Sequence, residues 1–211
     1  MDGFDRARSE MVDEQLRARG ITDERVLSAM GEVPRHEFVP AALIRDAYSD
    51  HPLPIGDGQT ISQPYVVALM LESAQIGPDD VVLDIGTGSG YAAAVIARLA
   101  RRVVSVERIP ALAESARDRL GSPTVSNVTV LDGDGRLGAP AEAPFDVIVV
   151  AAATPSISDA WRDQLRPGGR LVAPIGRPSY GQTLTCCVKR PDGALDCSAL
   201  GGVAFVPLIG G

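Results

Sequence analysis

The 211-residue sequence contains few histidines, cysteines or aromatic residues. With only His36 and His51 present, a histidine-rich metal site is excluded, and no metal is expected. Cys186, Cys187 and Cys197 show neither C-x-x-C spacing nor a zinc pattern. We expect them to be unpaired, packed hydrophobic residues in a reducing cytosol, although Cys197 could reach either neighbour across a hairpin.

Basic residues are outnumbered, and long apolar runs are missing. The chain has 20 Lys and Arg against 27 Asp and Glu, with a net charge of −7 and no basic run, which argues against nucleic-acid binding. The longest purely apolar run, Val147–Ala153, is too short to cross a bilayer, and residues 1–10 lack the apolar core of a secretory signal. We therefore expect a soluble, cytoplasmic, monomeric protein with no membrane partner.

The first third of the chain predicts helices followed by a loop. Ser9 can cap a helix that ends at Gly20, and a second helix is expected to begin near Asp23. Residues 45–63 carry two prolines, two glycines and no periodicity, so they predict a long loop. Loops of this length are uncommon in compact domains and are usually functional. Helix resumes after Pro64.

From Asp80 onward, short β-rich apolar runs alternate with helical stretches. Nearly continuous hydrophobicity predicts strands that are covered on both faces, as in a parallel sheet. The expected strands are 81–85, 103–106, 128–131, 146–152 and 170–175, with helices over 91–100, 111–120 and 156–165. Two further runs, 182–190 and 203–208, have no helix between them, and Pro191-Asp192-Gly193 offers a turn instead, which predicts an antiparallel end.

This pattern predicts an α/β fold: a doubly wound, mostly parallel seven-stranded sheet with a helical N-terminal cap and an antiparallel C-terminal end. We expect a single domain over 1–211. Residues 1–64 would supply the N-terminal helices and the loop, and residues 65–211 would form the α/β core.

A glycine-rich turn follows the first of these strands, with the sequence Asp84-Ile85-Gly86-Thr87-Gly88-Ser89-Gly90. Glycines let the backbone turn sharply and approach a ligand without side chains in the way. Gly86 and Gly88 are therefore expected to contact a ligand at the carboxyl edge of the sheet, where open α/β sheets bind. Taken alone the turn is weak evidence, because tight packing of a helix on a strand also requires glycine.

Acidic residues follow the neighbouring strands on the same edge. Glu107 closes the second strand, about 20 residues after the glycines, where an acid commonly binds ribose hydroxyls. Asp134, within Gly133-Asp134-Gly135, follows the third strand. Together with Asp84, these acids predict a nucleoside-bearing cofactor.

The same residues favour one cofactor over others. No Gly-Lys-Ser/Thr follows the glycines, which excludes a P-loop, and the G-x-G-x-G spacing differs from the dinucleotide pattern. S-adenosyl-L-methionine carries a sulfonium cation and no phosphate, so an acidic rim suits it. We expect Glu107 at the ribose, Asp134 at the adenine amine, and Asp84 near the methionine ammonium, directly or through water. The Asp84 carboxylate is equally well suited to accept hydrogen bonds from the backbone N–H groups of the glycine turn itself.

Several segments together resemble one known family, the protein-L-isoaspartate O-methyltransferases. They are PLPIGDGQTISQPY (52–65), VLDIGTGSGY (82–91), GDG (133–135), PGGRLVAPIG (167–176) and FVPL (205–208). The resemblance implies the Rossmann-like sheet of S-adenosyl-L-methionine-dependent methyltransferases. It also implies methylation of the free α-carboxylate of isoaspartyl residues in damaged proteins and peptides, where the ester then collapses to a succinimide and repair begins.

The resemblance also implies roles for individual residues. Ser62 matches the serine considered catalytic in the family, and Thr60 and Ile61 line the site beside it. Cofactor contacts are implied for Thr60, Ile61, Ser62, Asp84, Gly86, Gly88, Glu107, Asp134 and Gly135, and substrate contacts for Thr60, Ser62 and Val206. Val206 matches a strand that pairs with the substrate main chain. From its position alone, Ser62 would be a cap for the helix after Pro64.

The chemistry agrees with this family. An isoaspartyl α-carboxyl has a pKa of about 3.5, so it is already ionised at neutral pH and methyl transfer to it needs no general base. Two other functions stay open on the sequence. One is methylation of a normal aspartate in a biosynthetic peptide, and the other is cofactor binding without catalysis.

Overall fold

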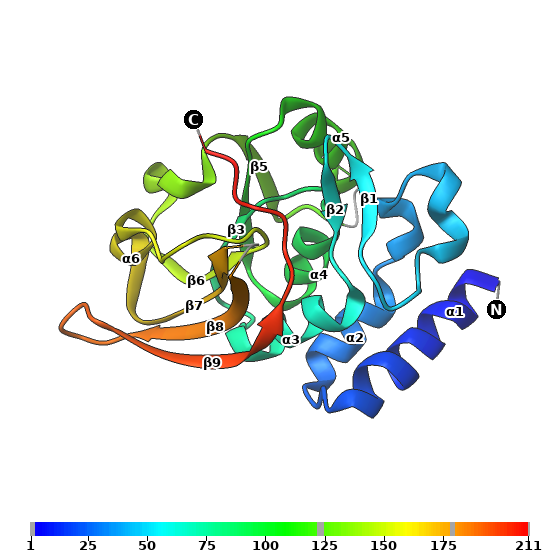
Figure 1. Cartoon of the computed structure of the whole chain (residues 1–211), viewed down its shortest axis with the longest axis horizontal. Coiled ribbons are helices and arrows are strands. Elements are labelled where there is room, and N and C mark those ends of the chain that lie inside the picture. The colour runs from blue at the N-terminus through cyan, green and yellow to red at the C-terminus, as the bar shows by residue number, and fades with distance from the viewer. Residues whose placement is uncertain (1–2, 122–124, 178–179, 211) are drawn as a thin grey trace.

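The computed structural model describes residues 3–121, 125–177 and 180–210. One sheet of seven strands, in the order β5-β4-β3-β6-β7-β8-β9, passes through the molecule (Figure 1). Strands β3 to β7 are parallel, and β8 and β9 are antiparallel. Their bounds are β3 Val81–Ile85, β4 Arg102–Glu107, β5 Val128–Asp132, β6 Phe145–Val150, β7 Leu165–Arg177, β8 Gly181–Lys189 and β9 Leu195–Val203. The predicted fold class is confirmed.

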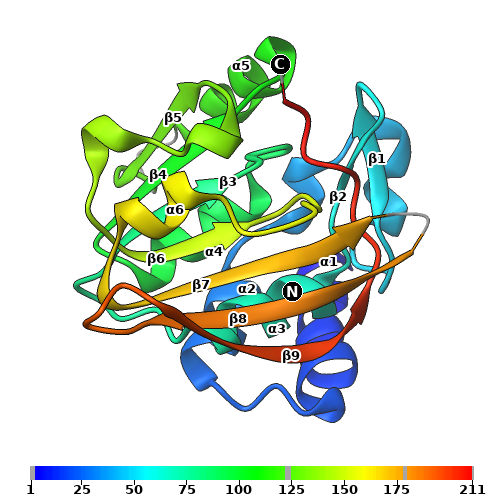
Figure 2. The same ribbon diagram turned by 60° about the vertical axis from the view of Figure 1, so that its left-hand side comes forward.

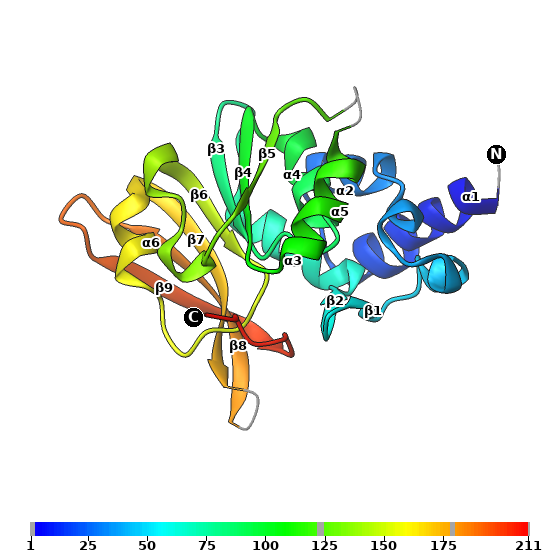
Figure 3. The same cartoon turned by 90° about the horizontal axis from the view of Figure 1, so that it is seen from above.

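Helices cover both faces of this sheet. They are α1 Gly3–Glu10, α2 Glu24–Glu32, α3 Pro64–Ala74, α4 Tyr91–Leu99, α5 Pro110–Leu120 and α6 Asp159–Gln164. Figure 3 shows α6 on one side of the sheet and the other helices on the opposite side. Because side chains alternate along a strand, Val82 packs in the core with α3 and α4, whereas Leu83 packs in the core with Trp161 of α6.

The first helix begins earlier than predicted, whereas the second begins where it was expected. Ser9 does not cap the first helix but lies inside it, because the helix already begins at Gly3. It continues as a π-helical segment, Met11–Leu16, and a 3-10 turn that ends at Gly20, where φ is 95°. The second helix begins as predicted, with the Asp23 carboxylate accepting hydrogen bonds from two backbone N–H groups.

The predicted loop at residues 45–63 contains a hairpin. Strands β1 (Leu53–Gly56) and β2 (Gln59–Ile61) pair in antiparallel fashion through a turn with positive φ at Asp57 (51°) and Gly58 (70°). An Asp-Gly turn with both residues at positive φ is the connection that two-residue hairpins favour. The prediction that this segment lacks regular structure was wrong, because the Asp-Gly signal outweighs the prolines around it.

The antiparallel end is confirmed, but its last strand begins earlier than predicted. The turn at Pro191-Asp192-Gly193 leads directly into β9, and only Val203 of the predicted strand 203–208 belongs to it. Most residues of β9 are exposed because it lies at the edge of the sheet, so it has little apolar pattern. Figure 2 shows β7, β8 and β9 side by side.

The cysteines also depart from the prediction. Cys187 and Cys197 are register partners on β8 and β9 and form a disulfide, whereas Cys186 is free. The expectation of unpaired cysteines was therefore wrong for two of the three, and the hairpin pairing named as the alternative is found. Within the described residues, none of the helices combines the length and apolar composition that a membrane crossing requires.

Candidate active site

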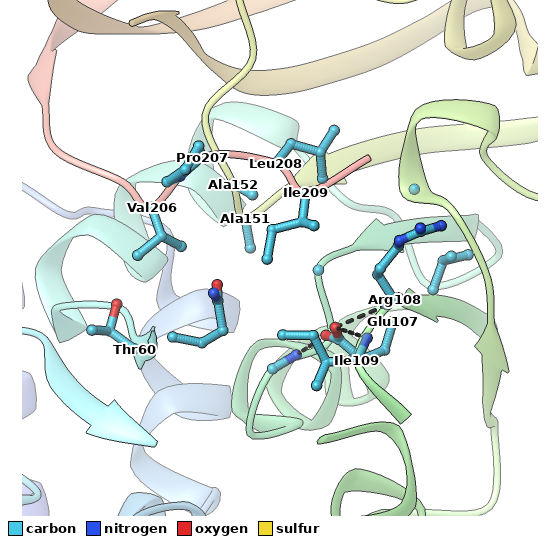
Figure 4. A pocket seen from close by; sticks show the side chains of 15 residues that line it. Thr60, Glu107, Arg108, Ile109, Ala151, Ala152, Val206, Pro207, Leu208 and Ile209 are labelled. Atoms are coloured by element: carbon cyan, nitrogen blue, oxygen red, sulfur yellow. Dashed lines mark hydrogen bonds between the residues drawn. The ribbon is translucent and has the colours of Figure 1, made fainter. Parts of the chain in front are cut away.

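Three adjoining cavities lie at the carboxyl edge of the sheet, beside the point where the strand order reverses between β3 and β6. We call two of them the Glu107 cleft and the Tyr91 cleft, each after a residue that lines it. The third is called the outer groove. Thr60 and Ala151 border all three, so the cavities meet at these two residues. Figure 4 shows Thr60 and Val206 facing Glu107 and Ile109 across the Glu107 cleft.

The predicted glycine turn forms the wall between the two clefts. Gly86 and Gly88 border both of them and have φ values of 91° and 53°, which favour glycine. The Gly86 N–H donates to the Val106 carbonyl at 2.9 Å, which fixes the turn against the end of β4. The turn thus presents backbone rather than side chains to both cavities.

Glu107 lies at the end of β4 and borders the cleft that carries its name. Its carboxylate accepts hydrogen bonds from the backbone N–H groups of Gly88 at 2.8 Å and of Arg108 and Ile109 at 2.9 Å each (Figure 4). Among the described residues, no Lys or Arg nitrogen lies within 4 Å of this carboxylate. The charge is therefore held in place by neutral donors, in an orientation suited to ribose hydroxyls.

Asp84 is completely buried beneath the same turn. One carboxylate oxygen accepts a hydrogen bond from the Ser105 hydroxyl at 2.6 Å, and Oδ1 has no partner among the described residues. Burial raises the pKa of Asp84 to about 7, with a further increase from the charge of Glu107 and a decrease from the Ser105 hydrogen bond. Asp84 borders none of the three cavities, and its bond is to Ser105 rather than to the N–H groups of the turn.

Asp134 and Gly135 follow β5 and have different surroundings. Asp134 caps a short 3-10 turn, Gly135–Leu137, and pairs with Arg136 at 2.7 Å. Gly135 borders the Glu107 cleft, and a Cβ atom there would lie 2.5 Å from Cγ2 of Ile85. Glycine is therefore required at 135, whereas Asp134 stands beside the cleft with its carboxylate in an ion pair.

Ser62 lies where the Tyr91 cleft meets the outer groove. The cap of α3 is Gln63, and its side chain makes no capping bond, so Ser62 does not have the capping role that its position also allowed. Within the described chain, the Ser62 hydroxyl has no hydrogen-bond partner, whereas its carbonyl accepts a bond from Arg35. Ile61 borders the same cleft. The hydroxyl is thus available to a ligand.

Val206 belongs to a C-terminal segment that runs beside the β1–β2 hairpin (Figure 2) and borders both the Glu107 cleft and the outer groove. Backbone bonds at 2.8 Å join Ala153 to Val206 and Leu208. The Gln182 side chain donates to the Phe205 carbonyl at 2.9 Å and accepts from the Phe205 N–H at 2.6 Å. The outer groove has a volume of about 550 Å³, within the usual range for ligand sites.

The structure brings most of the predicted residues together: Thr60, Ile61, Ser62, Gly86, Gly88, Glu107, Gly135 and Val206 border the cavities, and Asp84 and Asp134 lie just outside. Three further residues of the site were not predicted: Ala151, Gln182 and Arg35. Ala151 directly follows β6, so the switch point between β3 and β6 could have identified it. Gln182 and Arg35 act on backbone far along the chain and leave no local signal.

Comparisons with known proteins agree with this geometry. Residues 6–211 match the family model described as protein-L-isoaspartate(D-aspartate) O-methyltransferase. A protein-L-isoaspartate O-methyltransferase from Methanoculleus marisnigri is 58% identical over 205 residues, which cover 97% of this chain and 92% of that one. One from Brucella anthropi is 50% identical over 210 residues, covering 100% and 96%.

Solved structures give the same result. A protein-L-isoaspartate O-methyltransferase superposes with a TM-score of 0.87 at 31% identity, covering 96% of this chain and 66% of that one. A second, from Plasmodium falciparum in complex with S-adenosyl-L-homocysteine, has a TM-score of 0.83 at 25% identity and coverages of 96% and 98%. The predicted enzyme class and S-adenosyl-L-methionine cofactor are confirmed, and the chain belongs to the protein-L-isoaspartate(D-aspartate) O-methyltransferase family.

Proposed function

We propose that the family's reaction, methyl transfer to the free α-carboxylate of an L-isoaspartyl residue, takes place where the Tyr91 cleft meets the outer groove, with Ser62 as the catalytic residue. The observation that carries this proposal is the Ser62 hydroxyl, which borders both cavities and has no partner in the described chain. A hydroxyl so placed can donate to a carboxylate oxygen of a substrate in the groove.

The residues around the two clefts fit S-adenosyl-L-methionine. Glu107 would hold the ribose hydroxyls, because its carboxylate borders the cleft and has no cationic partner. Gly86, Gly88 and Gly135 would lie against the cofactor, with Asp134 toward the adenine amine and Asp84 toward the ammonium group. Thr60, Ile61 and Ser62 would border it from the hairpin side. When bound, this cofactor supplies an electrophilic methyl group.

The protein's own contribution is orientation and exclusion of water. The substrate carboxylate arrives ionised, so no side chain has to remove a proton. Ser62 would hold one carboxylate oxygen by a hydrogen bond and so direct the other toward the methyl group. Ile61 and Val206 would keep water from the reacting oxygen, because both place apolar atoms beside the meeting point of the cavities.

The outer groove would take the peptide itself. Its walls come from the β1–β2 hairpin and the start of α3 on one side, and from β8, the end of β9 and the following segment on the other. Main-chain pairing with the segment around Val206 would hold an extended peptide without reading its side chains, which suits a protein that repairs many targets. Residues 1–64 would then supply the substrate loop and residues 65–211 the cofactor site of a single domain.

A pair of peptides that differ only in aspartyl or isoaspartyl linkage tests the activity, with methyl-labelled S-adenosyl-L-methionine as donor. We expect base-labile label in the isoaspartyl peptide alone. Labelling of the normal aspartyl peptide alone would support the biosynthetic alternative, which the named relatives do not favour. Binding of S-adenosyl-L-homocysteine without any labelling would support the non-catalytic alternative.

The Ser62→Ala variant tests the proposed catalytic residue. Loss of the orienting hydrogen bond should lower kcat for the isoaspartyl peptide about 100-fold. The affinity for S-adenosyl-L-homocysteine should change little, because the cofactor is held mainly at the other end of the clefts. Steady-state kinetics and calorimetry measure the two quantities. An unchanged kcat would remove Ser62 from the reaction.

The compartment and the partners also remain proposals: a cytoplasmic monomer that binds neither nucleic acid nor membranes. The net charge of −7 and the absence of a basic run support the lack of nucleic-acid binding. Light scattering after gel filtration should give a mass near 22.1 kDa. A doubled mass would contradict the monomer.

A further inference from the structure

Arg35 is completely buried, which is unusual for an arginine. It begins a 3-10 turn, Arg35–Phe38. Its Nε donates to the Ala47 carbonyl and its Nη2 to the Ser62 carbonyl, both at 2.7 Å. Its Nη1 has no partner within the described chain. A guanidinium group is therefore enclosed in the protein directly behind the main chain of Ser62.

The charge of Arg35 is not neutralised by an ion pair. Among the described residues, no carboxylate oxygen lies within 4 Å of its nitrogens. The guanidinium carbon instead lies 4.8 Å from the centroid of the Tyr91 ring, close enough for a cation–π contact. A buried cation without a carboxylate costs several kcal/mol, which here has to be offset by the two carbonyl hydrogen bonds and the contact with Tyr91.

The two contacts of Arg35 join the two halves of the site. Ser62 belongs to the substrate loop just before α3, whereas Tyr91 is the first residue of α4 and directly follows the glycine turn. Both residues border the Tyr91 cleft. Arg35 thus contacts both the main chain of the proposed catalytic serine and the first residue after the glycine turn.

We propose that Arg35 is a positioning residue for methyl transfer, which fixes the Ser62 main chain against the glycine turn and places an unpaired positive charge behind the substrate carboxylate. The inference rests on the proposed role of Ser62. It also resolves an electrostatic difficulty, because a protein with a net charge of −7 has to bind an anionic group. The Arg35 guanidinium, behind the peptide group of Ser62, would favour binding of the substrate carboxylate without itself competing for the methyl group.

Arg25 provides a matched control. It also reaches two distant backbone carbonyls, with Nη1 on Ile76 at 2.7 Å and Nη2 on Leu99 at 2.9 Å. These carbonyls lie at the C-terminal ends of α3 and α4, whereas Arg35 acts at the N-terminal ends of the same two helices. Arg25 borders none of the three cavities of the site. Its loss therefore removes a similar pair of bonds away from the reaction.

The test compares Arg35→Met, Arg35→Lys and Arg25→Met in the full chain. For Arg35→Met we expect kcat for an isoaspartyl peptide to fall on the order of 100-fold, since small misplacements of reacting groups have effects of this size. The peptide KM should rise, and the affinity for S-adenosyl-L-homocysteine should stay at the parental value. Arg25→Met should lower the unfolding temperature but leave kcat and KM unchanged.

Arg35→Lys separates charge from geometry. Lysine keeps a positive charge but cannot bridge both carbonyls with a planar fork, so KM should return toward the parental value while kcat stays reduced. Should Arg35→Met not fold, this variant decides: reduced kcat with parental cofactor affinity supports the proposal, and parental kcat overturns it.

Two further results would overturn the proposal. One is equal loss of kcat in Arg35→Met and Arg25→Met, and the other is loss of cofactor affinity in proportion to kcat, because either would indicate general destabilisation. Failure of the proposed function is distinct, since the parental protein would then leave the isoaspartyl peptide unlabelled.

Discussion

The two edges of the parallel sheet carry the same kind of side chain but surround it differently. At the amino edge, Asp80 accepts a hydrogen bond from Arg170 at 2.6 Å, and Asp146 pairs with Arg166. At the carboxyl edge, Glu107 accepts three backbone N–H groups and Asp84 accepts the hydroxyl of Ser105. All four carboxylates are largely or wholly buried.

The difference lies in the charge of the partner. Arginines neutralise the amino-edge acids, so those acids connect strands and have no charge left for a ligand. Neutral donors hold Glu107 and Asp84, so neither carboxylate has a cationic partner in the described chain, which suits a cationic cofactor. Asp134, which follows β5 at the same edge, is instead paired with Arg136. Among Asp80, Asp146, Glu107 and Asp84, the partner rather than the burial therefore separates the arginine-paired acids from the two acids proposed to act on the cofactor.

Of the variants that test this difference between the two edges, Glu107→Gln should have the largest effect, and the effect should be on cofactor affinity. The neutral side chain loses its charge toward the cofactor, and its amide nitrogen meets backbone N–H groups that need an acceptor. We expect the affinity for S-adenosyl-L-methionine, measured by calorimetry, to fall about 100-fold, or about 3 kcal/mol. A loss below tenfold would mean that the carboxyl-edge charge is not used for binding.

Asp80→Asn tests the opposite edge. It leaves Arg170, whose Nε already lacks a partner in the described chain, without a charged acceptor. The free energy of unfolding should fall by about 2 kcal/mol. This loss is smaller than that for a fully buried ion pair, because the Asp80–Arg170 pair is partly exposed. Denaturant unfolding measures this, and cofactor affinity should remain at the parental value. Weakened cofactor binding would show that the edges are coupled.

The carboxyl edge was largely predictable from sequence because its signals are local. A strand, a turn with glycines at alternate positions and a helix follow one another within residues 81–99, and Glu107 ends the next strand. Parallel strands bring their carboxyl ends together whatever the loops between them do. The residues of that edge could therefore be placed before any contact was known.

Other parts of the molecule depend on contacts between distant residues. β9 has few buried side chains to pattern its sequence, because it is an edge strand. Arg35 acts on Ser62 across 27 positions, and Gln182 acts on Phe205 across 23. The hairpin at Leu53–Ile61 differs, because its Asp57-Gly58 turn was a local signal that the prolines obscured. Long-range polar contacts therefore account for the missed roles of Arg35 and Gln182, whereas weak or obscured local patterns account for the missed bounds of β9 and the missed hairpin.

The pH dependence of stability gives the smallest and most specific test of the carboxyl edge. In the folded protein without cofactor the pKa of Asp84 is about 7, against about 3.9 for an unfolded aspartate. Between these values the folded state binds more protons than the unfolded state, so ionisation of Asp84 destabilises the fold as the pH rises. The free energy of unfolding should therefore fall by about 1 kcal/mol between pH 6 and pH 8 from this group alone.

Asp84→Asn isolates this contribution, because asparagine keeps an oxygen acceptor for Ser105 but does not titrate. The difference in unfolding free energy between the two proteins should increase toward pH 8 in favour of the asparagine variant and level off above the folded pKa. Asp146→Asn, at the arginine-paired edge, is the matched control and should show no such increase. Parallel pH profiles for Asp84→Asn and the parental protein would mean that the buried carboxylate is neutralised by a partner after all, and the two edges would then not differ in the way proposed.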